Sequence, residues 1–206
     1  MKNTMMKVTL AATMLVGGIL GQGAVNVSNA DAAAATTTKV QPIMTDNLSK
    51  YGLKKDVELP VTVTAGGLNY TLEKIMIYDA KSNDALALTK KYGYNINGAQ
   101  YFIWTKITIE NKSSNLVQQN VKDLSEKWAL NFGDLSKGDA FAAMPKASYY
   151  KPNSKEALWD WSLKPGEKLS TYQGYLYTGE INYFKIRSIN KKKTADAVYV
   201  VEPRGN

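Results

Sequence analysis

The sequence predicts an all-β fold, an antiparallel β-sandwich of about seven or eight strands. Short segments rich in β-branched and aromatic residues recur from residue 59 to residue 202, and clusters of Gly, Pro, Asn and Ser separate them. Sustained helical periodicity is scarce. The 206-residue length fits a single domain once an N-terminal leader is set aside.

The N-terminus predicts export. Lys2 and Lys7 lead into an uncharged apolar run at residues 8–21, and the small residues Ala30 and Ala32 follow at signal-peptidase spacing. This run has about 14 residues, fewer than the roughly 20 that a membrane-spanning helix needs, so no membrane span is expected. We therefore expect a signal peptide at residues 1–32, cleaved between about Ala30 and Ala33, and a protein that is secreted, either extracellular or loosely associated with the cell wall.

Residues 33–58 begin with an Ala/Thr tract and show no sustained periodicity, which predicts a flexible N-terminal arm. The folded domain should cover residues 59–206. Its first strand is expected at residues 59–64 and its second at residues 68–80. The apolar residues of the second strand change phase after Leu72, which predicts a bulge near Glu73 and Lys74.

The next segment, residues 79–91, is polar with an Ala-Leu-Ala-Leu patch and predicts a short helical turn. Asn97-Gly98 then predicts a turn, because this pair favours positive φ. Residues 101–110 show the most regular alternation in the chain. This strand should place one face in the core, formed by Tyr101, Ile103, Thr105, Ile107 and Ile109.

The C-terminal half supplies the remaining strands. We expect a short strand at residues 128–132, with Trp128, Leu130 and Phe132 inward, and a loop at residues 133–150 that contains a short helix around residues 139–144. Further strands are expected at residues 169–177, 181–189 and 197–202, with a basic hairpin turn at residues 190–194.

Two segments carry a resemblance to a known family. The strand ending Ile107-Thr108-Ile109-Glu110-Asn111-Lys112 is followed some 50 residues later by the turn Leu163-Lys164-Pro165-Gly166-Glu167. This order resembles the exported bacterial immunoglobulin-like domains of the mycobacterial immunoprotective antigen type, over residues 59 to about 203. The resemblance implies an immunoglobulin-like fold and export. It implies no particular activity, because the motifs encode turn geometry.

The composition excludes several kinds of chemistry. The chain contains no histidine and no cysteine, so Ser-His-Asp triads, His-based zinc sites, cysteine nucleophiles and disulfides are excluded. We expect no cofactor and no enzymatic activity. The predicted function is a non-enzymatic binding or interaction module of the cell envelope or the extracellular space, with a glycan-active enzyme or a glycan-binding protein as the alternative.

The formal net charge of +8 suggests a polyanionic partner such as an anionic cell-wall polymer, with a protein partner also open. The candidate site is the basic cluster formed by Lys185, Arg187, Lys191, Lys192 and Lys193. A charged hairpin tip that protects a strand edge is the alternative interpretation. Nucleic-acid binding would use basic residues interleaved with exposed aromatic ones, and Tyr183 and Phe184 do lie close by. Nucleic acid is nevertheless not the expected ligand, because a charged hairpin tip is the commoner reason for such a cluster.

A second candidate site is aromatic and contains Tyr149, Tyr150, Trp159 and Trp161, whose rings could stack on sugars or could fill the core. Glu156 and Asp160 lie in the same segment and could form a glycosidase pair or a solvated pair on a loop. The oxygen-rich residues 79–84 could bind calcium, but they lack the glycine and distal glutamate of a calcium loop, so a polar turn is the alternative.

Overall fold

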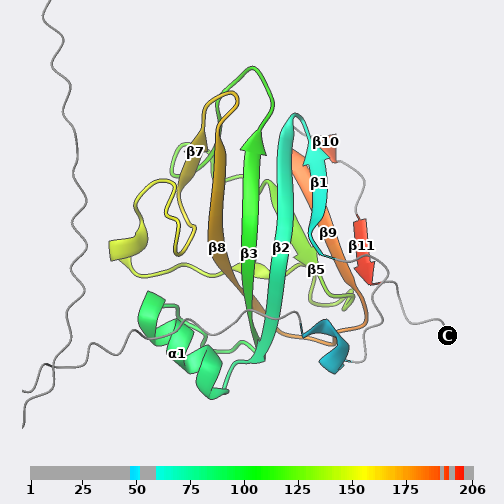
Figure 1. Cartoon of the computed structure of the whole chain (residues 1–206). Helices are drawn as coiled ribbons and strands as arrows, with labels where there is room; N and C mark the ends of the chain where they lie inside the picture. The colour runs from blue at the N-terminus through cyan, green and yellow to red at the C-terminus, as the bar shows by residue number, and fades with distance from the viewer. Residues whose placement is uncertain (1–46, 52–58, 191–192, 195–197, 202–206) are drawn as a thin grey trace, which may run out of the picture. The chain divides into compact units, whose positions relative to one another are not determined.

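The computed structural model describes residues 47–51, 59–190, 193–194 and 198–201, all of which belong to one unit of the chain (Figure 1). The predicted signal peptide and residues 33–46 of the predicted arm lie outside the described residues. Within them the prediction of a mostly β structure is confirmed, because every strand pair is antiparallel and a single α-helix interrupts the strands.

The larger sheet has five strands in the order β1-β2-β3-β8-β6. Their bounds are β1 Val61–Ala65, β2 Leu68–Asp79, β3 Tyr101–Asn111, β8 Lys168–Tyr177 and β6 Phe141–Ala142. The predicted bulge in β2 is confirmed, because Leu72 pairs with Ile107 and Lys74 with Lys106, so that Glu73 has no partner in the register. The extra residue returns Ile75 to the buried face.

A second sheet is organised around β9 (Phe184–Asn190), which pairs with β5 (Trp128–Asn131), β10 (Lys193–Thr194) and β11 (Val198–Val201). β4 (Val117–Gln119) and β7 (Trp161–Leu163) form a two-stranded pair that the sequence did not predict. Each of these two strands has only three residues, which is too short for alternation to be visible.

The main core lies between the two larger sheets. Trp128 of β5 stacks on Tyr70 of β2, with ring centroids 4.8 Å apart, and on Trp161 of β7 at 5.5 Å. The inward face predicted for β3 is confirmed, because Ile103, Ile107 and Ile109 are fully buried in this core. Their contribution is large, since burying each such side chain stabilises the fold by about 1.5–3 kcal/mol.

On the other face of β3, Phe102 and Trp104 are buried in a second cluster with the helix α1 (Asn83–Tyr92) and the loop that follows it. The Ser82 hydroxyl accepts a hydrogen bond from the Ala85 amide at the helix start, and Gly93 ends the helix in the left-handed conformation. The helix is thus longer than the predicted turn. Asn97-Gly98 connects α1 to β3 as a turn and forms no β-hairpin.

The short helix predicted around residues 139–144 is wrong. Residues 139–142 are extended instead and connect the two larger sheets: Asp139 bridges to Asn131 of β5, and Phe141–Ala142 pair with β8. The Ala140 amide donates to the Leu130 carbonyl at 2.8 Å. Pairing with two distant strands overrides the helical preference of the local Ala-rich sequence.

The two motifs that carry the family resemblance meet at Asn111. Its side-chain amide donates to the carbonyls of Asn115 (2.7 Å) and Leu163 (2.8 Å), and its Oδ1 accepts from the backbone and hydroxyl of Ser113. The Gly166 amide donates to the Asn111 carbonyl at 2.7 Å. Both motifs therefore form one structural joint at the end of β3.

Part of the segment predicted as a flexible arm packs against β2. A 3-10 helix, η1 (Leu48–Tyr51), buries Leu48 completely. The Asn47 side chain donates to the Ile77 carbonyl at 2.7 Å and accepts from the Ile77 amide at 2.8 Å. In the described part of the chain, no helix is long and apolar enough to cross a membrane.

Candidate functional site

The predicted basic cluster is only partly described. The guanidinium of Arg187 forms an ion pair with Asp139, which compensates its charge. The Nζ atom of Lys185 lies 5.8 Å from the centre of the Tyr183 ring. Lys191 and Lys192 lie outside the described residues, and for Lys193 only the backbone is described, in β10. Polyanion binding by this cluster stays a prediction.

The fold separates the aromatic residues of the second candidate site. Trp161 is fully buried in the main core, as the core interpretation of this residue predicts. Tyr149 is half-buried against α1, with its ring 5.2 Å from that of Tyr92, and Tyr150 is exposed. Trp159 alone lines a surface hollow. Sequence position therefore did not decide which rings face solvent.

The two carboxylates considered as a glycosidase pair have different surroundings. Asp160 lines the same hollow as Trp159, whereas Glu156 does not line it and acts electrostatically on Lys91 near the end of α1. The structure places Glu126 beside this hollow with Asp160 instead.

The oxygen-rich residues 79–84 form a turn and a helix cap. Asp79 accepts hydrogen bonds from the Lys81 amide and, through its carbonyl, from Ser82. Within the described ranges, no group of three or more Asp or Glu side chains could hold a metal ion.

Two surface hollows share the side chain of Phe141 as part of their walls. We call Phe141 and these two hollows together the Phe141 site. Phe141 belongs to the two-residue edge strand β6 and is 68% exposed, whereas the neighbouring Ala140 and Ala143 are buried. Alternation along the strand aims the ring outward because both alanines face the interior. The Phe141 side chain forms part of the wall of both hollows, so it joins them into one candidate surface.

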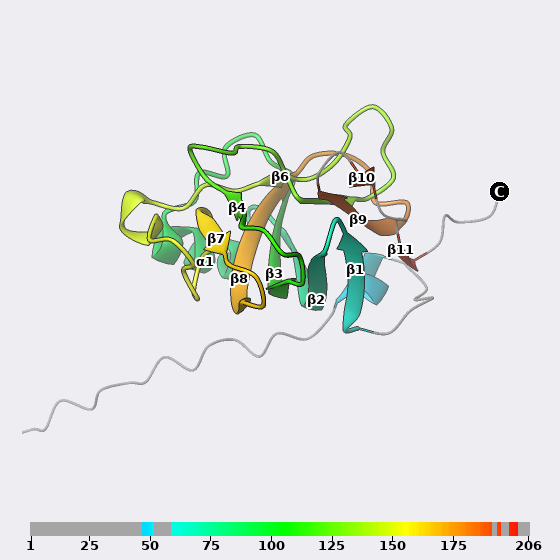
Figure 2. The ribbon, with the colours of Figure 1, turned by 90° about the horizontal axis from the view of Figure 1, so that it is seen from above.

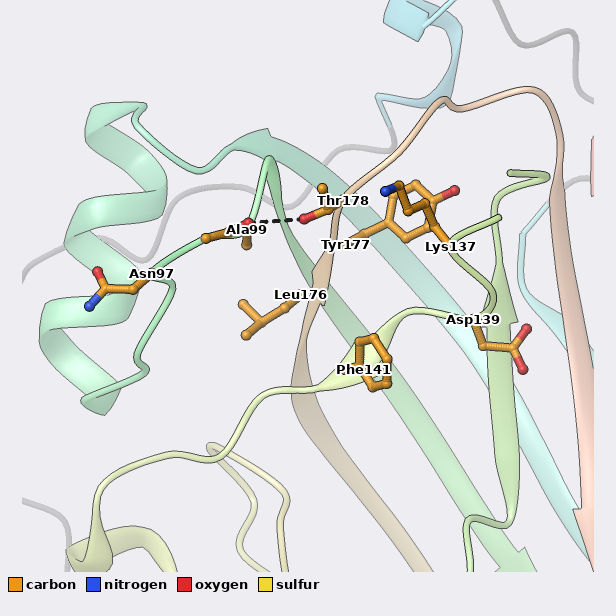
Figure 3. A pocket seen from close by; sticks show the side chains of 9 residues that line it. Asn97, Ala99, Lys137, Asp139, Phe141, Leu176, Tyr177 and Thr178 are labelled. Carbon is orange, nitrogen blue, oxygen red and sulfur yellow. Dashed lines mark hydrogen bonds between the residues drawn. The ribbon is translucent and has the colours of Figure 1, made fainter. Parts of the chain in front are cut away.

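The first hollow has a volume of about 250 Å³ and lies between the turn before β3, the end of β8 and β6 (Figure 3). Leu176 and Asp139 flank the Phe141 ring in this view, and Asn97 and Lys137 lie at opposite ends of the hollow. The Thr178 hydroxyl donates to the Gly98 carbonyl at 3.1 Å and holds the turn against β8.

The second hollow, of about 180 Å³, lies on the other side of Phe141. Its wall combines apolar groups with amides and carboxylates: Gln119, Asn120, Leu124, Glu126, Phe141, Ala142, Trp159 and Asp160. Leu124 is 77% exposed, so the second hollow has an apolar edge that solvent reaches.

A local network holds the loop that carries Leu124 and Glu126. The Lys127 ammonium is buried and lies 2.8 Å from Asp123 Oδ2. Hydrogen bonds from Lys127 and Ser125 lower the pKa of Asp123 to about 2. The ion pair is therefore present at neutral pH, and it spans the residues Leu124 and Glu126 that line the second hollow.

The carboxylates around Phe141 differ in whether they have an ion-pair or hydrogen-bond partner. Asp139 is paired with Arg187 and accepts a hydrogen bond from the Asn131 amide at 2.9 Å. Partial burial, and then repulsion by Asp139, raise the pKa of Glu126, while Arg187 acts in the opposite direction. Among the described residues, five polar side chains of the two hollows form no hydrogen bond or ion pair: Asn97, Lys137, Gln119, Glu126 and Asp160. These groups are available to a ligand.

A third hollow has a larger volume, about 450 Å³, but polar groups in its wall form hydrogen bonds within the protein. Asp134, in its wall, accepts hydrogen bonds from Ser136 and from the Glu180 amide, and the Tyr51 hydroxyl donates to the Ile77 carbonyl. These polar groups stabilise the fold. The Phe141 site is thus the better candidate for ligand binding.

The sequence analysis missed Phe141, Leu124 and Glu126. Phe141 was assigned to a short helix, in which it would have been one of several apolar residues. The available signal was a single large apolar residue in a polar segment, as in Lys122-Asp123-Leu124-Ser125. Such a residue either anchors its loop in the core or faces a partner.

Comparison with known proteins assigns no family. No family model matches the chain, and no curated protein matches its sequence. Similar solved structures include the yjhA protein from Bacillus subtilis, with 16% identity over 62% of this chain and 78% of that chain, at a TM-score of 0.38. Another is a functionally unknown protein from Listeria monocytogenes EGD-e, with 11% identity over 70% of this chain and 82% of that chain, at a TM-score of 0.40. At these TM-scores neither similarity assigns a fold family or a function.

Proposed function

We propose that the chain is an exported, non-enzymatic module that binds an extended, uncharged glycan at the Phe141 site. The observation that carries this proposal is the exposed Phe141 ring between two hollows in which the side chains of Asn97, Lys137, Gln119, Glu126 and Asp160 form no hydrogen bond or ion pair with another described residue. An aromatic ring offers an apolar face to a sugar ring, while the surrounding polar groups accept and donate hydrogen bonds to hydroxyls. Sites of this composition fix both the position and the orientation of a small ring.

The size of the hollows supports a chain-like ligand. Each hollow, at about 250 and 180 Å³, is smaller than the roughly 300–1,000 Å³ of a pocket for a drug-sized molecule. Each therefore accommodates about one ring. Because Phe141 forms a wall of both, a ligand that crosses this side chain would occupy the two hollows together.

The charge of the Phe141 site favours an uncharged ligand. Glu126 and Asp160 line the second hollow, and Asp139, already paired with Arg187, lines the first. These carboxylates repel a polyanion at short range. An anionic wall polymer therefore suits another part of the surface, whereas hydroxyl and acetamido groups suit this one.

The test uses Phe141→Ala in the secreted chain and soluble, uncharged glycan strands released from bacterial cell walls. We expect at least about tenfold weaker binding in calorimetric titration, the effect of losing a central aromatic contact worth about 1.4 kcal/mol or more. Leu135→Ala is the matched control, since Leu135 is 93% exposed and lines neither of the two hollows. Equal affinities of the native protein and the Phe141 variant would refute the proposal.

A glycan-cleaving enzyme is the second candidate, and one observation favours it: Glu126, whose pKa is raised, lines the same hollow as Asp160. Glycosidases use two carboxyl groups, of which the general acid has a raised pKa. New reducing ends after incubation with the same strands, absent for Glu126→Gln, would support the enzyme and contradict the non-enzymatic module.

We further infer that the fold is an immunoglobulin-like sandwich of the exported bacterial family that the motifs resemble. Two antiparallel sheets that share one core and the joint of both motifs at Asn111 support this inference. The apolar run and small residues near Ala30 support export.

A further inference from the structure

A positively charged surface lies at the end of α1. Its lysines are not among the residues that line the Phe141 site. The last turn of α1 carries Lys90 and Lys91, and the segment around the 3-10 helix η2 (Ala147–Tyr149) carries Lys146, Lys151 and Lys155. All five lysines are exposed. We call this set the lysine face.

A backbone hydrogen bond and a ring contact hold the two segments of the lysine face together. The Lys146 amide donates to the Tyr92 carbonyl at 2.8 Å, and the rings of Tyr92 and Tyr149 meet edge to face at 5.2 Å. Gly93 turns here with φ 73°, and a Cβ atom at this position would lie 2.6 Å from the Lys146 Cβ. Figure 2 shows the yellow η2 segment beside α1, in agreement with these contacts. The close approach requires glycine and fixes where Lys146 emerges.

Tyrosine rings orient two of the ammonium groups. The Nζ of Lys91 lies 4.7 Å from the centre of the Tyr92 ring, and the Nζ of Lys146 lies 5.7 Å from that of Tyr149. Both distances are within the range of cation–π attraction. A ring brings no negative charge to the ammonium group, and of these two lysines Lys91 also lies within the electrostatic influence of Glu156.

The lysine face has a large uncompensated charge. Among the ionisable lysine and carboxylate side chains of residues 146–157 and of the last turn of α1, the single acidic one is Glu156. The basic strand β9 differs, because Arg187 is neutralised by Asp139. A patch of one sign attracts a polymer of the other and raises its local concentration.

We propose that the lysine face binds a phosphodiester polymer without bases, that is, a polyol-phosphate or sugar-phosphate chain. The tyrosines of this face argue against base recognition, because Tyr92 is buried and Tyr149 is half-buried beneath Lys146. Stacking of successive bases needs several exposed rings, and here only Tyr150 is exposed. The face therefore recognises the charge of the backbone alone, at a site separate from the proposed glycan site.

The test compares two triple variants that each remove three positive charges, Lys146→Gln/Lys151→Gln/Lys155→Gln on the lysine face and Lys191→Gln/Lys192→Gln/Lys193→Gln on the hairpin. Poly(glycerol phosphate) is titrated into each secreted chain at several salt concentrations. We expect the first variant to bind at least about tenfold more weakly and to lose about two from the slope of log K against log salt, since each phosphate contact contributes about 0.7–0.9. The hairpin variant should bind within about threefold of the native protein.

Several results would overturn this proposal. An equal or larger loss in the hairpin variant would move the site to the cluster predicted from sequence. Tighter binding of single-stranded DNA with the same number of phosphates would show that bases are recognised. Absence of binding to poly(glycerol phosphate) at low salt would refute the proposal that the lysine face binds a phosphodiester polymer. Phe141→Ala should leave this binding unchanged, so the glycan proposal can fail independently.

Discussion

Replacing Asn111 by alanine tests whether the joint between the two sequence motifs holds the fold. Asn111 is fully buried, and its side chain makes four hydrogen bonds, to Ser113 (two), Asn115 and Leu163. Each such bond contributes about 0.5–1.5 kcal/mol, and a buried group left without a partner costs about 1–3 kcal/mol. The substitution removes all four bonds from a fully buried position. We expect Asn111→Ala to lower the free energy of unfolding by about 3–5 kcal/mol.

The assay is urea denaturation followed by tryptophan fluorescence. With a slope of about 2 kcal/mol per molar urea, the midpoint should fall by about 2 M. A loss of this size is a large fraction of the roughly 5–15 kcal/mol that stabilises a typical domain. Asn115→Ala is the matched control, because this side chain is exposed and only its carbonyl takes part in the joint, so its effect should stay below about 0.5 kcal/mol. A loss below about 1 kcal/mol for Asn111→Ala would refute the structural role of the joint.

Two further predictions concern the main core. Ile107→Ala should lower the free energy of unfolding by about 2–5 kcal/mol, since the fully buried side chain leaves a cavity, and a change below about 0.5 kcal/mol in urea denaturation would contradict its burial. Burial raises the pKa of Tyr70 and Tyr175 above the ordinary value of 10.0, so the unfolded chain releases these protons first and stability should fall as pH rises above about 10. Tyrosinate absorbance should show both rings ionising only with unfolding, and a stability that stays constant through that range would be the contrary result.

The positions of the long strands along the chain and their inward faces could be predicted from sequence, whereas their order in the sheets could not. In β2 and β3 the alternation is strong because one face is buried along the whole strand, and the phase change after Leu72 indicated the bulge. The turn at Pro165-Gly166 was also predictable, since Gly166 has φ 80° and the Glu167 amide donates to the Lys164 carbonyl. These signals are local, so they depend little on the rest of the fold.

The candidate sites were far less predictable. Trp159 and Trp161 differ by two positions, yet one lines a hollow and the other is fully buried, because β7 begins at Trp161 and leaves Trp159 outside the strand. Phe102 and Phe141 are the same residue type, but α1 covers one and nothing in the described chain covers the other to the same extent. Exposure of an aromatic ring depends on which distant segment packs over it.

The sequence by itself determined that chemistry based on histidine or cysteine is excluded, because the chain contains neither residue. It also determined the long strands and the turns, because period-2 alternation and glycine positions are properties of short segments. Only the tertiary structure decided the surfaces. The Phe141 site combines residues from 97 to 178, and the lysine face joins the end of α1 to residues 146–155. Surfaces of this kind arise from contacts between segments far apart in the chain, and the alternation within any one segment contains no information about them.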